Sequence, residues 1–254
     1  MEIAKKLLEK INQGELVTGV LATDHIWPGM TELLKSTGLD YLMIDYEHGP
    51  HDQSVISQIC DIGRMIDFPI LIRPVSTDKH IVRRMIDLGP CGLMFPSIES
   101  TEQLDEARDA IWMPPRGRRR PGGIGNRWVE DFNYETWKEV VEDNFIVLAQ
   151  IESQQGVDCI DAIASHDIVS SLALGPYDLS ADLGCCGDPD DPKLIDAMLK
   201  VKQAGEKHGM KTWCLGADPM AVKELGFTFL CIGVSCMMLK QKVKDVIGLR
   251  NDEA

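Results

Sequence analysis

Eight short apolar segments recur along the chain, and longer segments with helical periodicity separate them. Most of the apolar segments carry hydrophobic residues at consecutive positions, not at alternate ones. This pattern is typical of parallel strands that are covered on both faces of a sheet. The segments are ELVTGVLA (15–22), YLMIDY (41–46), PILIRP (69–74), CGLMFP (91–96), FIVLAQIE (145–152), SSLALGP (170–176), KTWCLG (211–216) and FLCIGV (229–234).

The intervening segments have the periodicity of helices, and several end in glycine, a frequent helix terminator. Eight strands that alternate with helices in 254 residues predict an α/β fold, a single-domain (β/α)8 TIM barrel over residues 1–254. An open doubly wound sheet is the alternative, but no Gly-x-Gly-x-x-Gly motif follows the first strand. The first residues predict an amphipathic helix in which Ile3, Leu7, Leu8 and Ile11 share one face.

One connection breaks the alternation of strands and helices. Residues 112–144 are rich in Arg, Pro, Gly and Trp and include the basic run RGRRR at 116–120. Long connections in compact domains commonly serve as lids or binding loops, so we expect a functional loop here.

The composition narrows the class of protein. A formal net charge of -14 argues against nucleic acid or an anionic membrane as a partner. No apolar run is long enough to span a bilayer, and the charged first residues lack the core of a signal peptide, so we expect a cytoplasmic location. The eight cysteines form no Cys-x-x-Cys pair, which favours reduced thiols, although the adjacent Cys185 and Cys186 leave a redox or metal-binding role open.

Ionisable and polar residues gather where the predicted strands end, which in a barrel is a single face. An ionised side chain is costly to bury alone, so such residues indicate mutual pairing or a metal. These residues are Asp45, Glu47 and His48 after the second strand, Arg73 after the third, Gln150 and Glu152 in the fifth, and Asp178 after the Gly175-Pro176-Tyr177 turn of the sixth.

Glu152 and Asp178 end neighbouring strands, so their carboxylates could meet at the barrel mouth. Two carboxylates completed by water and substrate oxygens suit a hard divalent ion such as Mg²⁺ or Mn²⁺. The alternative is that each carboxylate caps the helix that follows it, and spacing does not decide between the two.

Arg73 stays charged and needs an anion or a polarised oxygen, although a structural salt bridge would also satisfy it. His48 is a candidate general base, because the ordinary pKa of histidine lies near working pH. A lone histidine near a loop is more often structural, but the charged neighbours of His48 favour catalysis. Asp87, in the helix after the third strand, could orient its imidazole or be a surface acid.

The chain resembles the HpcH/HpaI class II pyruvate aldolases, metal-dependent enzymes of the phosphoenolpyruvate/pyruvate barrel group. The resemblance covers almost the whole chain. The segments that carry it are YLMIDYEHGPHD, ILIRPV, RRMIDLGPCGLMFPSIES, MPPRGRRRPGG, AQIES, LALGPYDLSADLG and FLCIGVS.

The resemblance implies roles for individual residues. Glu152 and Asp178 would ligate a divalent metal (Mg²⁺ or Mn²⁺, with Co²⁺ possible), which also chelates the 2-oxo acid. Asp45 would lie near the metal without binding it. Arg73 would stabilise the enolate, and His48, held by Asp87, would move the proton of the aldol hydroxyl. The substrate would also contact Gln150 and the turn formed by Gly175, Pro176, Tyr177 and Asp178. No strand ends in the lysine that a Schiff-base aldolase would need.

Three departures from the family pattern concern the aldehyde half of the substrate. The loop after the paired prolines carries four arginines before Pro121-Gly122-Gly123, Ser235-Cys236 follows the last strand, and Tyr177 precedes the metal-ligand Asp178. The arginines, Arg119 and Arg120 in particular, suggest recognition of an acidic aldehyde. The alternative is a solvated basic loop that pairs with acidic surface.

The expected reaction is therefore the cleavage of a 4-hydroxy-2-oxo acid, of sugar-acid or dicarboxylate type, to pyruvate and an aldehyde. An oxaloacetate decarboxylase, a lyase of CoA thioesters, or a binding protein on an inactive barrel are the alternatives. The resemblance also implies a homo-hexamer, a trimer of dimers that exchange their last helix. The tail segment MLKQKVKDVIG has the apolar face that such an exchange requires.

Overall fold

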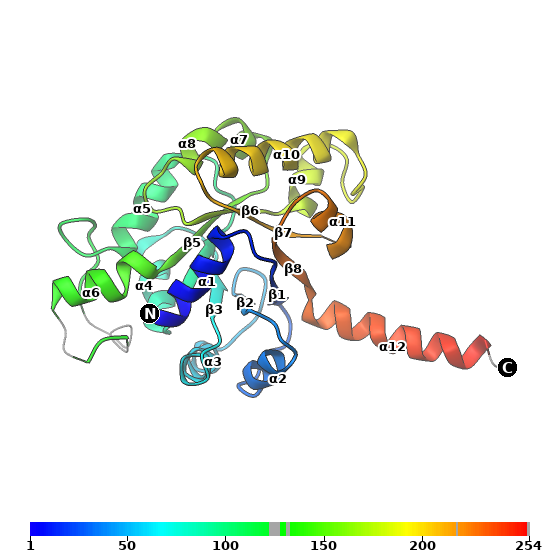
Figure 1. The fold of residues 1–254 in the computed structure, drawn as a ribbon, viewed down its shortest axis with the longest axis horizontal. Coiled ribbons are helices and arrows are strands. Elements are labelled where there is room, and N and C mark those ends of the chain that lie inside the picture. The colour runs from blue at the N-terminus through cyan, green and yellow to red at the C-terminus, as the bar shows by residue number, and fades with distance from the viewer. Residues whose placement is uncertain (122–127, 131–132, 217, 253–254) are drawn as a thin grey trace.

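The computed structural model describes residues 1–121, 128–130, 133–216 and 218–252. Eight parallel strands follow one another around a closed barrel, and helices surround it (Figure 1). This confirms the predicted (β/α)8 fold and excludes the open sheet. The strands are β1 (Val17–Ala22), β2 (Tyr41–Asp45), β3 (Ile70–Arg73), β4 (Gly92–Phe95), β5 (Ile146–Ile151), β6 (Ser171–Leu174), β7 (Thr212–Leu215) and β8 (Phe229–Val234).

The helices between the strands begin at residues whose side chains satisfy free backbone N–H groups. Asp52, Asp78 and Asp191 each accept a hydrogen bond from the first turn of the helix that follows. The main helices are α1 (Glu2–Asn12), α2 (Met30–Ser36), α3 (Gln53–Met65), α4 (Lys79–Asp87), α5 (Thr101–Ile111), α6 (Tyr134–Val140), α7 (Gln154–Asp158), α8 (Ile160–Ala164), α9 (Pro176–Asp182), α10 (Pro192–Lys207), α11 (Pro219–Glu224) and α12 (Ser235–Asp252).

The barrel interior is closed by large side chains at the amino-terminal ends of the strands. The rings of Tyr41 and Phe229 meet edge to face with centroids 5.4 Å apart. Trp213 donates to the hydroxyl of Tyr41 at 2.7 Å, and that hydroxyl donates to the carbonyl of Leu230. A Cβ at Gly19 would lie 2.3 Å from the Tyr41 ring, so the glycine makes room for it. The site therefore lies at the other, carboxyl-terminal end of the strands.

Helix α1 contributes an apolar face to the core, as its periodicity predicts. Ile3, Leu7 and Ile11 are buried, and Leu8 packs partly against them. The amino group of Met1 donates to the carbonyl of Val140, the last residue of α6. Helix α1 therefore also covers the connection that leads into β5.

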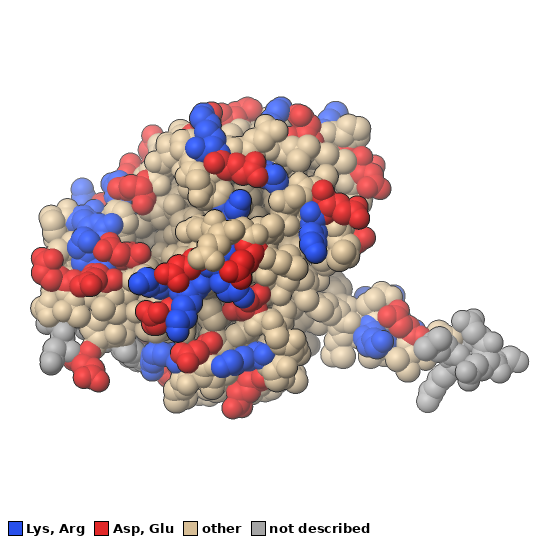
Figure 2. All heavy atoms as spheres, in the orientation of Figure 1, with Lys and Arg blue, Asp and Glu red and all other residues tan. Residues whose placement is uncertain are grey.

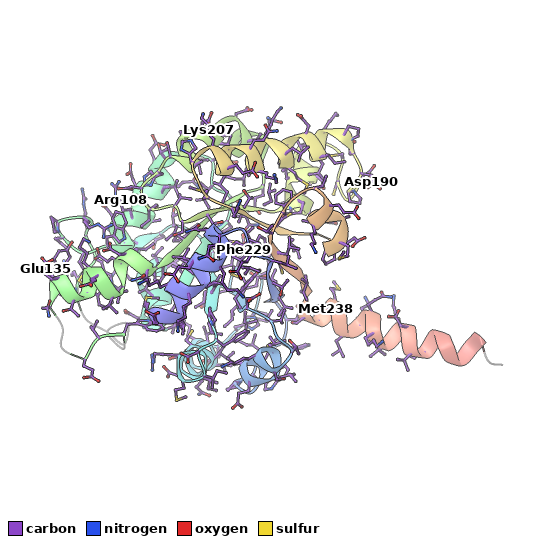
Figure 3. The ribbon with its side chains drawn as sticks, viewed as in Figure 1. Arg108, Glu135, Asp190, Lys207, Phe229 and Met238 are labelled. Carbon is purple, nitrogen blue, oxygen red and sulfur yellow. The ribbon has the colours of Figure 1, made fainter. Side chains whose placement is uncertain are left out.

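Helix α12 projects away from the barrel, beyond Met238 (Figures 1 and 3). The part of the chain that the structure describes contains no helix long and apolar enough to cross a membrane. All eight cysteines are free thiols, as expected from their spacing. Burial raises the pKa of Cys91 and of Cys231 to about 12, so these two behave as apolar core residues.

Candidate functional site

Asp45 and Arg73 form a buried ion pair at the centre of the barrel mouth. They are register partners at the carboxyl ends of the neighbouring strands β2 and β3. Arg73 donates from Nε and Nη2 to the two oxygens of Asp45 at 2.9 and 2.7 Å. Burial would raise the pKa of Asp45, but the guanidinium outweighs it and the pKa is lowered. Asp45 therefore stays ionised and holds Arg73 in one orientation.

Arg73 keeps one nitrogen for a ligand. Nε and Nη2 are bound to Asp45, and Nε also lies 3.2 Å from Glu47 Oε2. Among the described residues Nη1 has no such partner. A planar guanidinium that is anchored on one side and free on the other is suited to an oxyanion.

Glu47 connects Arg73 to His48. Its Oε2 lies 3.8 Å from Nε2 of His48, whose side chain is 62% exposed. Burial raises the pKa of Glu47, although the charges of Arg73 and His48 oppose this shift. The carboxylate of Glu47 therefore lies between the arginine and the histidine and interacts with both.

Glu152 is held at the end of β5 by three hydrogen bonds. Its Oε1 accepts from the backbone N–H and the hydroxyl of Ser97, both at 2.8 Å, and Oε2 accepts from Gln150 Nε2 at 2.5 Å. Burial raises the pKa of Glu152, the Ser97 bonds oppose this, and the charges of Glu47 and Asp178 raise it further. The carboxylate is therefore held in one position, but its surroundings do not fully offset its negative charge.

Gly175 gives Glu152 the space that it occupies. A Cβ at this position would lie 2.4 Å from Glu152 Oε2 and 2.7 Å from Gln150 Nε2. We expect Gly175→Ala to push the carboxylate aside and to weaken divalent-metal binding and aldol activity together by about tenfold or more. Calorimetry with Mn²⁺ and a pyruvate-release assay would measure both. Gly248→Ala, which adds a methyl group in open space on α12, is the control and should bind Mn²⁺ like the unchanged protein. Unaltered Mn²⁺ affinity in Gly175→Ala would contradict this reading.

Neither Glu152 nor Asp178 acts as a helix cap, which was the alternative to ligation. The cap of α7 is Ser153, whose hydroxyl accepts from Gly156. The cap of α9 is Gly175, and Asp178 lies in the first turn of that helix without a side-chain capping bond. Both carboxylates are thus available for a ligand.

The residues at the mouth fit a hard divalent cation. Glu47, Glu152 and Asp178 influence one another electrostatically, and Oε1 of Gln150 is buried without a hydrogen-bond partner among the described residues. No cluster of three or more potential ligands occurs in the described ranges. Glu152 and Asp178 would therefore supply two oxygen ligands, and water or substrate oxygens the rest.

Asp87 and His48, predicted to act together, are not brought together within this chain. Asp87 is the last residue of α4, which runs from the catalytic end of the barrel to the opposite end. Its carboxylate accepts from Nη2 of Arg119 at 2.8 Å. Helical periodicity shows which residues share a face of a helix. It does not show that Asp87, at the end of α4, lies at the opposite end of the barrel from His48.

The arginine-rich loop also lies away from the mouth of its own barrel. It follows α5, so it starts at the amino-terminal end of the strands. Arg116 stacks on Trp112 at 3.7 Å and pairs with Glu142 and Asp143. The side chain of Arg119 is only 1% exposed. The predicted contact of Arg119 and Arg120 with substrate is therefore not found within the chain, and Gly122 and Gly123 lie outside the described residues.

Two residues of the site were not singled out by sequence reasoning. Ser97 holds Glu152, and its φ of 51° places it in the left-handed region that non-glycine residues rarely adopt. Thr23 donates to Asp45 Oδ2 at 3.0 Å. Thr23 directly follows β1, and Ser97 lies just beyond β4. This position after a strand is the sequence feature that could have identified them. A serine or threonine at that position is too common to stand out.

Comparisons with known proteins identify the family of the chain. The family model described as HpcH/HpaI aldolase/citrate lyase matches residues 25–240. A hydroxypyruvate/pyruvate aldolase of Chromohalobacter salexigens is 30% identical over 85% of this chain and 87% of that protein. A 5-keto-4-deoxy-D-glucarate aldolase of Escherichia coli is 32% identical over 81% of each chain.

Comparison of the fold with solved structures points to the same family. The crystal structure of an HpcH/HpaI aldolase from Desulfitobacterium hafniense superposes with a TM-score of 0.86 at 27% identity and covers 96% of both chains. The matched residues include the polar strand ends from His48 to Asp178. The chain is a lyase of the aldolase class and belongs to the HpcH/HpaI aldolase/citrate lyase family.

Proposed function

We propose that this protein is a divalent-metal-dependent aldolase that cleaves a 4-hydroxy-2-oxo acid to pyruvate and an aldehyde. One observation carries the proposal. At the mouth the charge of Arg73 acts on the carboxyl groups of Asp45, Glu47 and Glu152, and the carboxyl group of Asp178 acts on those of Glu47 and Glu152, so that within the described residues four carboxyl groups gather around the guanidinium of Arg73 and its neighbours. An anionic 2-oxo acid would be repelled there, so a bound cation such as Mg²⁺ or Mn²⁺ is needed for substrate to enter.

A distant structure of the same fold was solved with a 2-oxo acid and a divalent metal. The citrate lyase beta subunit of M. tuberculosis was solved with oxaloacetate and magnesium, and it matches this chain at 15% identity with a TM-score of 0.57. At that identity the likeness concerns the fold. The proposal rests on the carboxylates of this chain.

The residues divide the reaction between them. A metal held by Glu152 and Asp178 would supply positive charge next to the 2-keto group. Nη1 of Arg73 would donate to the oxygen on which negative charge grows, and the two bonds to Asp45 hold the guanidinium in one orientation. Cleavage of the C3–C4 bond leaves its electron pair on the pyruvate fragment as the enolate. His48 accepts the proton of the C4 hydroxyl as the aldehyde carbonyl forms.

The aldehyde is the less determined half of the substrate. The relatives named above act on hydroxypyruvate and pyruvate or on a keto-deoxy sugar acid, which suggests a polar, hydroxylated aldehyde. Tyr177, with 70% of its surface exposed at the start of α9, lies beside Asp178 and can contact that half. Condensation assays with pyruvate, Mg²⁺ or Mn²⁺ and a panel of aldehydes test the proposal. Absence of any condensation, and of metal-dependent exchange of the pyruvate methyl protons, would overturn it.

His48→Ala is expected to separate two reactions of the same site. Aldol cleavage needs a base at the hydroxyl, so we expect it to fall by about 10²–10⁴-fold. Decarboxylation of oxaloacetate passes through the same enolate without that base, so its rate should remain within about threefold. Pyruvate release from both substrates measures the difference. Equal loss of both activities would contradict the role of His48 as the base of the aldol step alone.

We propose that α12 docks on a second copy of this chain, in a cytoplasmic homo-oligomer. Several large apolar side chains are exposed on the helix: Met237, Met238, Leu239, Val243, Val246 and Ile247. Val243→Asp combined with Ile247→Asp is expected to lower the molar mass measured by light scattering to that of a smaller assembly, because charge is costly in an apolar interface. Lys240→Asp is a control on the same helix. An unchanged mass in the double variant would show that α12 is not at an interface.

A further inference from the structure

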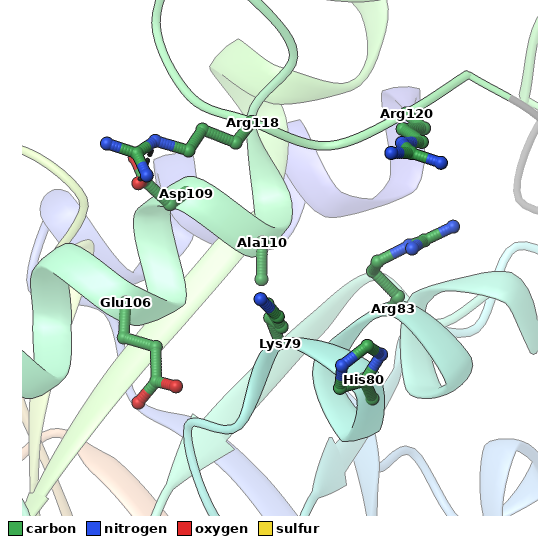
Figure 4. A pocket seen from close by; sticks show the side chains of 8 residues that line it. All are labelled: Lys79, His80, Arg83, Glu106, Asp109, Ala110, Arg118 and Arg120. Carbon is green, nitrogen blue, oxygen red and sulfur yellow. Dashed lines mark ion pairs between the residues drawn. The ribbon is translucent and has the colours of Figure 1, made fainter.

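A second charged site lies on the outer flank of the barrel, between α4 and α5. A cavity of about 540 Å³ opens there, lined by Lys79, His80, Arg83, Glu106, Asp109, Ala110, Arg118 and Arg120. Figure 4 shows the guanidinium groups of Arg83 and Arg120 on the same side of the pocket as His80, with Glu106 on the opposite side. All lining residues come from helices and the loop after them, so the pocket is separate from the strand ends that form the mouth.

The positive charges in this pocket are only partly neutralised. Asp109 pairs with Arg118 at 2.9 Å, and Glu106 accepts a hydrogen bond from the hydroxyl of Thr77 at 3.0 Å. Lys79, Arg83 and Arg120 have no carboxylate within ion-pair distance among the described residues. Three unpaired cations therefore face one carboxylate, Glu106, and the pocket has an excess of positive charge.

This excess is unusual for the molecule in which it occurs. The chain carries a formal net charge of -14, and acidic and basic side chains alternate over the face shown in Figure 2. An acidic surface offers many partners for a basic side chain. Cations that stay together and unpaired repel one another, and an anion in the space between them would remove that repulsion.

Backbone hydrogen bonds and an ion pair hold the loop that carries Arg118 and Arg120 against α5 and α4. The backbone N–H groups of Arg118 and Arg119 donate to the carbonyls of Asp109 and Trp112, both at 2.9 Å. The buried side chain of Arg119 pairs with Asp87, at the end of α4. Gly117 approaches so closely that a Cβ would lie 2.4 Å from the carbonyl oxygen of Trp112. These contacts join the loop to both helices, and Arg120, the residue after Arg119, lines the pocket together with Arg83 (Figure 4).

We infer that this pocket binds a compact, multiply charged oxyanion of the phosphate or polycarboxylate type. Two guanidinium groups offer paired N–H donors that match the oxygens of such an anion, and Lys79 adds a third cation. The volume exceeds that of a single phosphate group, so the ligand carries more than one charged group or a small organic part. The inference is independent of the aldolase proposal, because it uses no residue of the barrel mouth.

Inorganic pyrophosphate, titrated into the full chain by calorimetry at low ionic strength without divalent metal, tests the inference. We expect one site per chain, with affinity that falls as salt is added. Arg83→Gln and Arg120→Gln should each weaken binding at least tenfold. Glu106→Gln removes the opposing charge and should tighten it. Lys200→Gln removes one charge from an exposed position on α10 and should leave the affinity within about twofold.

Four results would overturn the inference. The first is no binding to the unchanged protein, and the second is an equal loss in Lys200→Gln. The third is binding that Arg73→Gln abolishes while the pocket variants retain it, because the anion would then lie in the barrel mouth. The fourth is a change of molar mass in Arg83→Gln without pyrophosphate binding to the unchanged protein, which would make the pocket an interface between copies of the chain. Inorganic phosphate and citrate at matched ionic strength then distinguish phosphate ligands from polycarboxylates.

Discussion

Replacing Arg73 by lysine is expected to lower kcat/KM for aldol cleavage by about 10²–10³-fold, the usual effect of losing a donor to a developing oxyanion. Lysine keeps the positive charge next to Asp45. It cannot bind both oxygens of Asp45 and at the same time direct a second nitrogen at the substrate. The loss should therefore lie in the chemical step, and kcat should fall more than KM rises. Steady-state kinetics with a cleavable 4-hydroxy-2-oxo acid measures both constants.

The control for this change is Arg84→Lys. Arg84 is exposed on α4 and donates to Gln53 at 2.6 Å, away from the mouth. It should retain full activity. Thermal unfolding of both variants shows whether a loss of activity results only from a destabilised barrel. An Arg73→Lys variant that is folded and retains more than a third of the activity would show that substrate does not depend on the fixed guanidinium.

Replacing Glu152 by glutamine is expected to weaken Mn²⁺ binding by about 10–100-fold or more, since one of two charged ligands is lost. Calorimetry or electron paramagnetic resonance of free Mn²⁺ measures this without any assay of turnover. Glu206→Gln, on the exposed side of α10, is the matched control. Unchanged Mn²⁺ affinity in Glu152→Gln would remove Glu152 from the metal site and with it the main argument for a metal-dependent aldolase.

The same variant should be more stable than the unchanged protein when metal is absent. Burial and neighbouring carboxylates raise the pKa of Glu152 in the folded state above its unfolded value. A carboxyl group of this kind favours the folded state below the unfolded pKa and loses that contribution as pH rises through the folded pKa. Glutamine does not ionise, and Gln150 can turn its unpaired Oε1 toward the new amide. In urea unfolding with a chelator, the advantage of Glu152→Gln should therefore grow from about pH 4.5 to neutral pH.

The positions of the strands follow from the sequence because burial on both faces of a parallel sheet demands consecutive apolar residues. YLMID, ILIR and IVLAQI are completely buried strands, as their composition predicts. Polar residues that end such strands must lie on the catalytic face of a barrel, which is why Asp45, Arg73 and Glu152 were identified. Their roles as ligand or donor remain predictions until the variants are measured.

The partners of individual side chains depend on distances between elements, which periodicity does not contain. The pair of Asp87 with Arg119 joins the end of a helix to a loop 32 residues later. Ser97 reaches Glu152 across 55 residues, from a backbone with a positive φ that no pattern in the sequence indicates. The arginine-rich loop was expected near substrate from the family resemblance and from its length. Its place is determined by backbone hydrogen bonds to the end of α5, which no pattern of side chains reveals.

The sequence by itself determined the barrel, its eight strands and the set of polar residues at their carboxyl ends, because hydrophobic patterning records which residues are buried. The tertiary structure alone decided that Asp45 orients Arg73, that Ser97 and Gly175 position Glu152, and that the arginines gather on the flank between α4 and α5. These relations arise from strand register and from the packing of helices on the barrel. They form between residues that are far apart in the chain, and only the folded structure brings them within contact distance.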